Sequence, residues 1–416
     1  MVDRAPRFDE IAYVGHARRL LAGLGFVDAH GQPASYWPIG YPAALALTYY
    51  IAGESYWSAV VLNVVCGAAT AVVAFLLARS LLGPSTALMA GLVVAAYPNH
   101  VFYSSLQLTE PLFTLVVVGM TFLILRWPTA LRSAAAAGVL LGVAALTRPA
   151  IVLFPLVLPV WYVRLGNGLR AAITRAGVVA LMLVVIVTPW ILRNHRVSGG
   201  WELASSSGDN FWRGNNPEAL GGYARSREME RALIAGEGRD ASRGYRLGLA
   251  AMASEPGKAA LRAAQKVSYF FALETDGLLW NLKGLQRPWP TWTTVLLLGL
   301  ANAMYLAVLS GCVLALVSGA GGPVGSLCGL LTVYLVAVSI VFLGDPRYHY
   351  PLVPFAAIVA TKAALEELPA LWAGLRSSQR SAYVRAGRWA AITSMFVTLM
   401  IANLYLKTLE SGGSAR

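Results

Sequence analysis

Long apolar stretches recur along the chain and constrain its fold more than any other feature. A transmembrane helix needs about 20 consecutive, mainly apolar residues. Ten stretches reach or approach this length, at residues 56–79, 85–103, 105–126, 130–147, 149–163, 174–192, 291–318, 323–343, 348–366 and 388–407. Because Pro149 disfavours helix at the residue before it, we expect a tight turn between the two short stretches beside it. The sequence therefore predicts an all-α, polytopic transmembrane protein with about ten spans.

Composition supports this class and argues against others. The chain is 57% hydrophobic and 13% charged, with a mean hydropathy of +0.59, whereas a soluble domain carries about 25% charged residues. The net charge of +13 does not indicate a nucleic-acid partner, because Lys and Arg of membrane proteins collect in cytoplasmic loops. Cys66, Cys312 and Cys328 lie in apolar stretches and are interpreted as packing residues.

The positive residues indicate which loops face the cytoplasm. If residue 56 starts outside, the inner loops carry Arg79, Arg126, Arg132, Arg164, Arg170, Arg175, Lys362, Arg376, Arg380, Arg385 and Arg388. The short outer turns carry only Arg148 and the Asp345/Arg347 pair. This bias follows the positive-inside rule and supports the assumed orientation. The same parity places residues 1–55 and 194–290 outside.

Four parts follow from this topology. They are an extracytoplasmic amphipathic helix and loop with an acidic motif (1–55), a transmembrane core (56–193), an extracytoplasmic helical loop (194–290) and C-terminal transmembrane helices (291–416). Residues 7–23 predict the amphipathic helix, which ends near Gly23 and Gly25. The 194–290 segment is polar and favours helix around 225–274, so we expect it to lie over the outer membrane face.

Two acidic residues stand alone in long stretches without acids. Glu110 is the only acid between positions 54 and 202, and Asp345 is the only one between 276 and 366. Ionisable groups at membrane depth are costly, so a solitary one usually has a partner and a function. The structural alternatives are a first-turn carboxylate stabilised by the helix dipole for Glu110, and a cap or turn residue before Pro346 for Asp345.

The charged residues of the outer side suit one kind of chemistry. Besides the two solitary acids, this side holds Asp9, Glu10, Arg148, Arg193, His195, Arg347 and His349. A carboxylate can act as general base on a hydroxyl, and Arg side chains can hold a phosphate and stabilise it as a leaving group. Sugar transfer from a polyprenyl-phosphate sugar needs both functions. Alternatively, the arginines are membrane-interface anchors and the histidines are loop residues rather than metal ligands.

Seven short motifs occur in an order that matches a known family. They are Asp9-Glu10 with Tyr13 and Ala17-Arg18, Trp37-Pro38-Ile39-Gly40-Tyr41-Pro42, Leu108-Thr109-Glu110-Pro111, Leu146-Thr147-Arg148-Pro149, Thr188-Pro189-Trp190 with Arg193-Asn194, Gly208-Asp209-Asn210 followed by Gly214-Asn215-Asn216-Pro217, and Asp345-Pro346-Arg347-Tyr348 with Pro351 and Pro354. Over most of residues 7–355 the chain thereby resembles the GT-C superfamily of membrane glycosyltransferases. Within it, the chain is similar to bacterial family 39-like relatives of dolichyl-phosphate-mannose protein mannosyltransferases and of the lipid A aminoarabinose transferase.

The resemblance implies an integral-membrane, inverting hexosyl- or pentosyltransferase. It would move a sugar from a polyprenyl-phosphate donor to a hydroxyl of a protein, lipid or glycan, on the periplasmic face of a bacterial inner membrane. The implied catalytic residues are Asp9, Glu10 and Glu110. Arg148, Arg193, Arg347, Tyr348 and His349 are implied to bind the donor phosphate or lipid, and Tyr13, Tyr41, Asn210 and Asn215 to line the substrate site. Clustered carboxylates suit a divalent cation, but no obligatory metal is expected.

The chain departs from the family pattern in two ways. The family normally has a transmembrane helix before the acidic loop, whereas this chain begins about ten residues upstream of it. We also find no sizeable soluble domain after the last span, so acceptor recognition is expected to fall to the outer loops.

The main alternative to a glycosyltransferase is a lipid or solute transporter or flippase. Transporters often show inverted repeats and charges at the bilayer midplane, whereas the acids here lie at helix ends without a convincing repeat. A non-catalytic relative is a third alternative, against which the retained Asp9, Glu110 and Arg347 argue.

Overall fold

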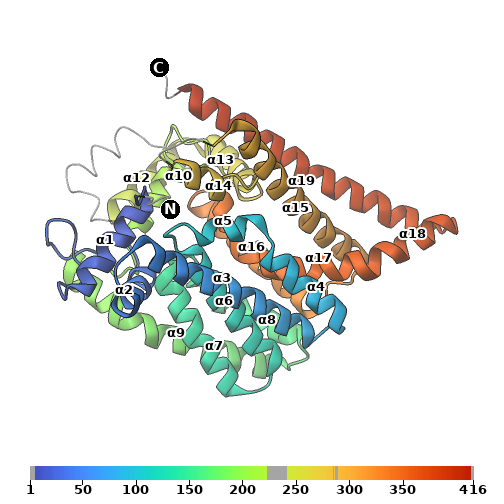
Figure 1. Cartoon of the computed structure of the whole chain (residues 1–416), viewed down its shortest axis with the longest axis horizontal. Helices are drawn as coiled ribbons and strands as arrows, with labels where there is room; N and C mark the ends of the chain where they lie inside the picture. Colours follow the sequence, from blue (N-terminus) through green and yellow to red (C-terminus); the bar gives the residue numbers. More distant parts are fainter. Residues whose placement is uncertain (1–4, 223–240, 284, 286–288, 414–416) are drawn as a thin grey trace.

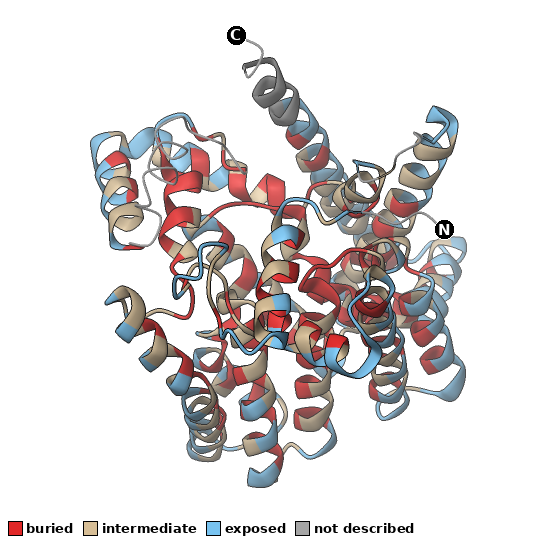
Figure 2. Ribbon diagram, turned by 60° about the vertical axis from the view of Figure 1, so that its left-hand side comes forward, coloured by how far each residue is buried: buried red, intermediate tan, exposed pale blue. Residues whose placement is uncertain are grey.

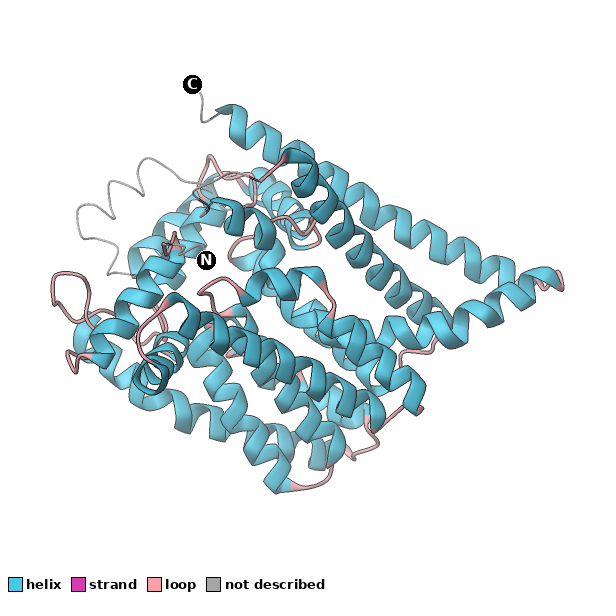
Figure 3. Cartoon of the chain, viewed as in Figure 1, coloured by secondary structure: helices cyan, strands magenta, loops and turns pink. Residues whose placement is uncertain are grey.

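The computed structural model describes residues 5–222, 241–283, 285 and 289–413, and this part of the chain is helical (Figure 3). Its one extended pairing is an isolated bridge between Val27 and Pro33. The predicted all-α class is therefore confirmed for the described residues. Figure 2 shows buried residues along the faces that the helices turn toward one another and exposed residues on the outward faces.

Four helices of the described chain are long and apolar enough to cross a membrane. They are α3 (Tyr56–Arg79), α9 (Leu169–Ser198), α15 (Thr291–Ser318) and α16 (Gly322–Val341). Only 28–33% of the residues in their most apolar windows are buried inside the protein. The remaining apolar surface needs lipid rather than water as its surroundings, so the chain is an integral membrane protein with several spans.

Most of the other predicted spans are shorter or interrupted. Residues 105–126 and 130–147 form the 17-residue helices α6 (Glu110–Arg126) and α7 (Leu131–Thr147). The 85–103 stretch is divided into α4 (Pro84–Ala95) and α5 (Pro98–Ser104), because Pro98 has no N–H to continue the first helix. The C-terminal stretch lies within α19 (Arg380–Gly413). Ten uninterrupted spans are thus not what the structure shows, and the number of crossings stays a prediction.

The stretches that contain several prolines form broken helices. After α7 the chain continues as η1 (Pro149–Ile151), η2 (Phe154–Leu156) and α8 (Leu158–Arg164). After α16 it continues as η4 (Pro346–Tyr348), η5 (Tyr350–Leu352), α17 (Val353–Lys362), a π-helical turn η6 (Ala363–Glu367) and α18 (Leu368–Arg376). The predicted turn before Pro149 is confirmed, since Arg148 is extended with φ −141° and ψ 103°.

Small residues allow the long helices to approach closely. A Cβ atom on Gly138 of α7 would lie 2.5 Å from the carbonyl oxygen of Val179 in α9. One on Gly142, a turn later, would lie 2.6 Å from the Cβ of Ile186. Such close backbone contact is how helices associate in lipid, where there is no hydrophobic drive between them.

The two predicted outer parts gather at one end of the helices (Figure 1). Here α1 (Asp9–Leu21) packs on α2 (Gly40–Ala52), and α10 (Ser206–Asn215) packs on α12 (Ala241–Ser254). The predicted helix at 7–23 is confirmed as α1. The rest of the long loop forms α13 (Pro256–Phe270) and α14 (Asp276–Lys283), while positions 225–240 of its expected helical part lie outside the described residues. Two backbone bonds, Ser205 N–H to Ser35 O and Ser206 N–H to Tyr36 O, tie α10 to the loop after α1.

Candidate active site

A cavity of about 450 Å³ opens where α1, α6, the α7–η1 turn, α10, α16 and η4 meet. Its charged lining residues are Asp9, Glu110, Arg148 and Arg347. Its other polar and aromatic lining residues include Tyr13, Tyr36, Trp37, Trp201, Ser206, Ser207, Asn210, Tyr245 and Tyr348. Apolar side chains of η1, α9 and α16 complete the wall. The structure thus brings charged residues from four separate motifs into one space.

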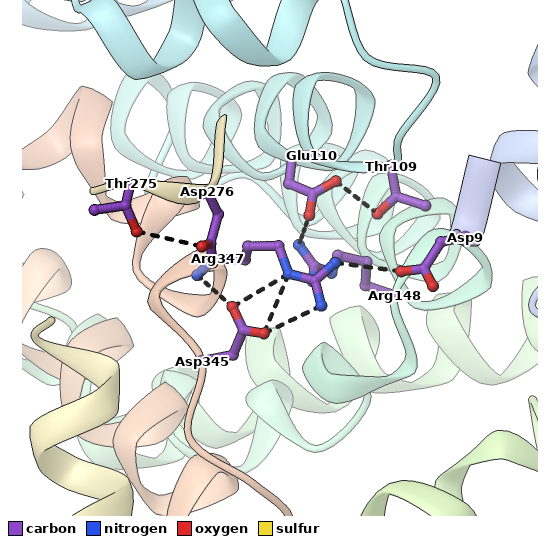
Figure 4. Close-up of polar contacts among 8 residues, drawn as sticks. All are labelled: Asp9, Thr109, Glu110, Arg148, Thr275, Asp276, Asp345 and Arg347. Carbon is purple, nitrogen blue, oxygen red and sulfur yellow. Dashed lines mark hydrogen bonds and ion pairs between the residues drawn. The ribbon is translucent and has the colours of Figure 1, made fainter. Parts of the chain in front are cut away.

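The centre of the charged group is Arg347 (Figure 4). Its Nε lies 3.2 Å from both carboxylate oxygens of Asp345, and its Nη2 lies 3.1 Å from Asp345 Oδ2. Its Nη1 reaches Asp9 Oδ2 at 3.2 Å. Both carboxylates raise the pKa of Arg347, which burial alone would lower. Arg347 is therefore a fixed cation that links η4 to the first turn of α1.

Asp345 is both a cap and a partner of Arg347. Its Oδ1 accepts a hydrogen bond of 2.8 Å from the backbone N–H of Arg347, at the start of η4. Burial opposes its ionisation, but the charge and hydrogen bonds of Arg347 outweigh this and lower its pKa from the ordinary value. The two sequence interpretations of this solitary acid are thus compatible.

Glu110 and Arg148 form the second ion pair of the cavity. Glu110 is the first residue of α6 and 1% exposed, and its Oε1 lies 3.4 Å from Arg148 Nη1. The guanidinium of Arg148 lies over the rings of Phe113 and Tyr348, at 5.9 and 5.6 Å. Within the described chain the side chain of Arg148 has this loose ion pair but no hydrogen bond, so its guanidinium N–H groups remain available to a ligand.

Three of the charged residues lie at helix ends because of the same local sequence feature. Glu110, Arg148 and Asp345 each precede a proline. Proline starts a helix readily but cannot donate a backbone hydrogen bond, and it disfavours helical backbone in the residue before it. Arg148 and Asp345 accordingly have extended backbones, and Glu110 lies at the very start of α6. Each side chain therefore projects from a helix end instead of lying along a helix.

The uncharged residues predicted to line the site divide into two groups. Tyr13, Asn210 and Tyr348 line the cavity. Burial, reinforced by the negative charges of Asp9 and Glu110, raises the pKa of Tyr13, so this residue keeps its phenolic proton. Asn210 makes no side-chain hydrogen bond within the described residues, which leaves its amide free for a ligand.

Tyr41 and Asn215 lie outside the cavity lining. The fully buried Tyr41 donates to Asn63 and packs edge-on against Tyr13, at 5.5 Å. Asn215 donates to the carbonyl oxygens of Phe211 and Val341 and accepts a 2.8 Å bond from Lys266. The structure thus gives both residues internal partners in place of the expected contact with a ligand.

Glu10 also lies away from the cavity. It is fully buried, and its carboxylate accepts hydrogen bonds from the backbone N–H groups of Arg7, at 3.0 Å, and Gln107, at 2.8 Å. It therefore caps the start of α1 and ties this helix to the segment before α6. Adjacent helix residues point about 100° apart, which explains why Asp9 faces the cavity and Glu10 does not.

Arg193 and His349 point elsewhere as well. Arg193 donates to the backbone oxygens of Phe26 (2.6 Å) and Ala34, so it clamps the loop after α1. The buried His349 contacts the carbonyl oxygen of Phe270 through Nδ1, at 2.6 Å, and Glu274 through Nε2, at 3.2 Å. Neither residue is part of the cavity lining.

Several residues of the site were not among those predicted. Asp345 was recognised as a solitary acid but not assigned to the site, although its isolation was the signal. Tyr36, Trp201 and Tyr245 line the cavity from the loops and from α12, where no repeating pattern marks them. Within the described residues, no three His, Cys, Asp or Glu side chains lie close enough to hold a metal ion. The metal requirement stays a prediction.

Comparison with known proteins assigns part of the chain to a family. Residues 37–192 match the family described as dolichyl-phosphate-mannose-protein mannosyltransferase. The matched segment covers less than half of the chain. It contains Glu110 and Arg148, whereas Asp9 and Arg347 lie before and after it. The resemblance suggested by the sequence is thus confirmed. A separate comparison with curated proteins found no match.

Solved structures share the fold at low sequence identity. The oligosaccharyltransferase of Archaeoglobus fulgidus in its apo form has a TM-score of 0.53 and 13% identity, over 99% of this chain and 52% of the other. Its complex with an inhibitory peptide and a dolichol-phosphate gives 0.51 and 13%, over 96% and 51%. This chain therefore spans about half the length of that enzyme. ArnT from Cupriavidus metallidurans, bound to undecaprenyl phosphate, is less similar in structure, with a TM-score of 0.42 and 16% identity over 89% and 75%.

Proposed function

We propose that this protein is an inverting glycosyltransferase that transfers a sugar from a polyprenyl-phosphate donor to a hydroxyl acceptor on the extracytoplasmic face of the membrane. One observation carries the proposal. The cavity holds both a carboxylate that is accessible to a ligand, Asp9, and an arginine, Arg148, whose guanidinium makes no hydrogen bond within the described chain. The family to which residues 37–192 belong supports the same reaction.

Asp9 is the proposed general base. Its Oδ2 is held by Arg347, while its Oδ1 has no hydrogen bond within the described chain. It takes the proton of the acceptor hydroxyl as the hydroxyl oxygen attacks the anomeric carbon. The bond from that carbon to the phosphate oxygen breaks, and polyprenyl phosphate leaves with the electron pair. Attack from the side opposite the leaving group inverts the configuration at the anomeric carbon.

Arg148 is the proposed phosphate ligand. A guanidinium binds phosphate oxygens through paired N–H groups, and its positive charge stabilises the phosphate as it leaves. The 3.4 Å pair with Glu110 is long, so phosphate can replace it readily. Glu110 would then be free to accept a hydrogen bond from a sugar or acceptor hydroxyl. Arg347 already has two carboxylate partners, which makes it the weaker candidate for the phosphate.

The apolar wall suits the lipid part of the donor. Val152, Leu153, Ile191, Val338 and Phe342 continue the cavity away from its charged residues. Leu153 is 59% exposed and follows the extended Arg148 by only five residues. A lipid phosphate bound at Arg148 could therefore pass its chain along this side of the bundle toward the bilayer.

The test is transfer by Asp9→Asn in reconstituted membranes supplied with labelled polyprenyl-phosphate sugars and membrane extract as acceptor source. General-base catalysis contributes about 10²–10⁴-fold, so the rate of sugar transfer should fall by at least about 100-fold. The matched control is Glu54→Gln, which makes the equivalent carboxylate-to-amide change at an exposed residue paired with Arg18. Wild-type transfer by Asp9→Asn would remove Asp9 as the base.

The same preparation separates transfer from transport. A transferase releases polyprenyl phosphate, whereas a flippase moves the intact lipid-linked sugar across the vesicle membrane. Movement of label without cleavage of the sugar–phosphate bond would support the transport alternative. The assay also identifies the substrates. The labelled donor that is consumed reveals the sugar, and the component of the extract that becomes labelled reveals the acceptor.

A further inference from the structure

The guanidinium of Arg347 has a third partner besides its two carboxylates. It lies over the indole ring of Trp280, with its central carbon 5.1 Å from the ring centroid. Asp345 and Asp9 bind the guanidinium through its nitrogens, and the indole of Trp280 lies beneath it. A cation over an indole face gains a favourable electrostatic interaction, which helps to hold the guanidinium in place. Trp280 thereby contacts the group that binds Asp9.

Trp280 also contacts the residue that precedes Asp9. Phe8, the residue before Asp9, places its ring 5.2 Å from that of Trp280. Its backbone has φ 52° and ψ −125°, a conformation that residues other than glycine rarely adopt. Ring packing on Trp280 offsets the cost of this conformation. The same indole therefore restrains both the backbone before Asp9 and the side chain to which Asp9 binds.

Trp280 belongs to a helix that is itself firmly held. In α14 the neighbouring Asn281 donates to the carbonyl oxygen of Phe102 and accepts from the hydroxyl of Ser105, both at 2.8 Å. Gly277 packs directly on α5, where an added Cβ would lie 3.0 Å from the Tyr103 ring. The indole is thus fixed to the helix bundle, so it can restrain other residues.

We propose that Trp280 is a positioning residue for the reaction: it holds Arg347 and Phe8 so that the Asp9 carboxylate points at the acceptor hydroxyl. The inference rests on the proposed function of Asp9. Trp280 does not line the cavity, so it acts through Arg347 and Phe8 rather than by touching the substrate. The long loop between α9 and α15 thereby completes the catalytic group. A residue that only packs the core would affect stability but would not change kcat selectively.

The first test compares Trp280→Leu with Trp280→Phe in the transfer assay. A misplacement of about 1 Å at a reacting group costs on the order of 100-fold in rate. Trp280→Leu should lower kcat by about 10- to 100-fold and leave the KM for the donor within about threefold. Trp280→Phe keeps an aromatic face for Arg347 and should recover most of kcat. Trp292→Leu is the matched control, because this tryptophan is 69% exposed and belongs to α15.

The second test asks whether the effect passes through Asp9. In the Asp9→Asn background, Trp280→Leu should cause little further loss, because effects of residues that act as a unit are not additive. Thermal unfolding of each variant separates a loss of fold from a loss of rate. The inference is overturned if Trp280→Leu retains wild-type kcat, if Trp280→Phe shows no recovery, or if the two losses multiply. Full transfer by Asp9→Asn itself would instead overturn the proposed function.

Discussion

Arg347 Nη1 lies 3.2 Å from Asp9 Oδ2 and so joins two residues that are 338 positions apart. The contact joins the first helix to the segment after α16 at the wall of the cavity. Among the described residues it leaves Asp9 with one bound and one free carboxylate oxygen. A base held in this way keeps a fixed direction without losing the lone pairs that it needs.

Arg148 provides the most direct test of donor binding. Arg148→Gln should raise the KM for the donor by about 10- to 100-fold, because hydrogen bonds to a charged group contribute about 1.5–3 kcal/mol. Arg148→Lys should recover only part of the affinity, since an ammonium group lacks the paired N–H geometry. Initial rates against donor concentration provide the measurement. A double variant with Glu110→Gln controls for the carboxylate left without its cation, and an unchanged KM would place the phosphate elsewhere.

Substitution of Arg193 should lower the stability of the protein and leave donor binding unchanged, the reverse of what we expect for Arg148. It bonds the carbonyl oxygens of Phe26 and Ala34, so Arg193→Met leaves two partly buried acceptors without this donor. We expect a loss of about 1–3 kcal/mol in the free energy of unfolding, with the KM of the remaining folded enzyme unchanged. Thermal unfolding in detergent and donor kinetics measure the two effects. A large rise in KM at wild-type stability would restore Arg193 as a phosphate ligand.

Gly40 is predicted to control the position of Arg148. A Cβ here would lie 2.5 Å from Thr147 Oγ1 and 2.7 Å from the carbonyl oxygen of Leu146, at the end of α7. Gly40→Ala should therefore push the residue before Arg148 and cost about 1–3 kcal/mol, as overpacking does. Transfer should fall in parallel. Gly177→Ala has no atom within 4 Å of the new Cβ and is the control. Equal behaviour of the two variants would contradict this prediction.

His16 should make the docking of α1 sensitive to acid. Burial, aided by the charge of Arg19, lowers its pKa to about 4. Between pH 6.5 and 4 the unfolded chain binds more protons than the folded one, so stability should fall as the pH decreases through this range. His16→Phe retains stacking on Phe26, whose ring lies 4.1 Å away, but cannot titrate. Its unfolding temperature should therefore fall less from pH 7 to 4.5. Identical pH profiles would exclude His16 as the cause.

The sequence predicted the charged residues of the site better than their neighbours. Glu110 was singled out because it is the only acid in a long apolar part of the chain, and Arg148 because it is one of the few charges in the short outer turns. Arg193 also follows a proline-containing motif, but its N–H groups bind a loop whose path depends on distant contacts. Asn210 and Asn215 both lie on α10, but five residues correspond to about 500° of rotation, so they face different neighbours.

What the sequence determined by itself is the class of the protein and the kind of chemistry it can perform. The length of the apolar stretches requires helices that lie in lipid, and prolines determine at which helix ends the charged side chains lie. Only the tertiary structure decided which charges meet. Whether Asp9 or Glu10 faces the cavity, and whether Arg148 or Arg193 keeps free N–H groups, depends on helix rotation and on partners from remote segments. These contacts are non-local, so no pattern in neighbouring residues encodes them.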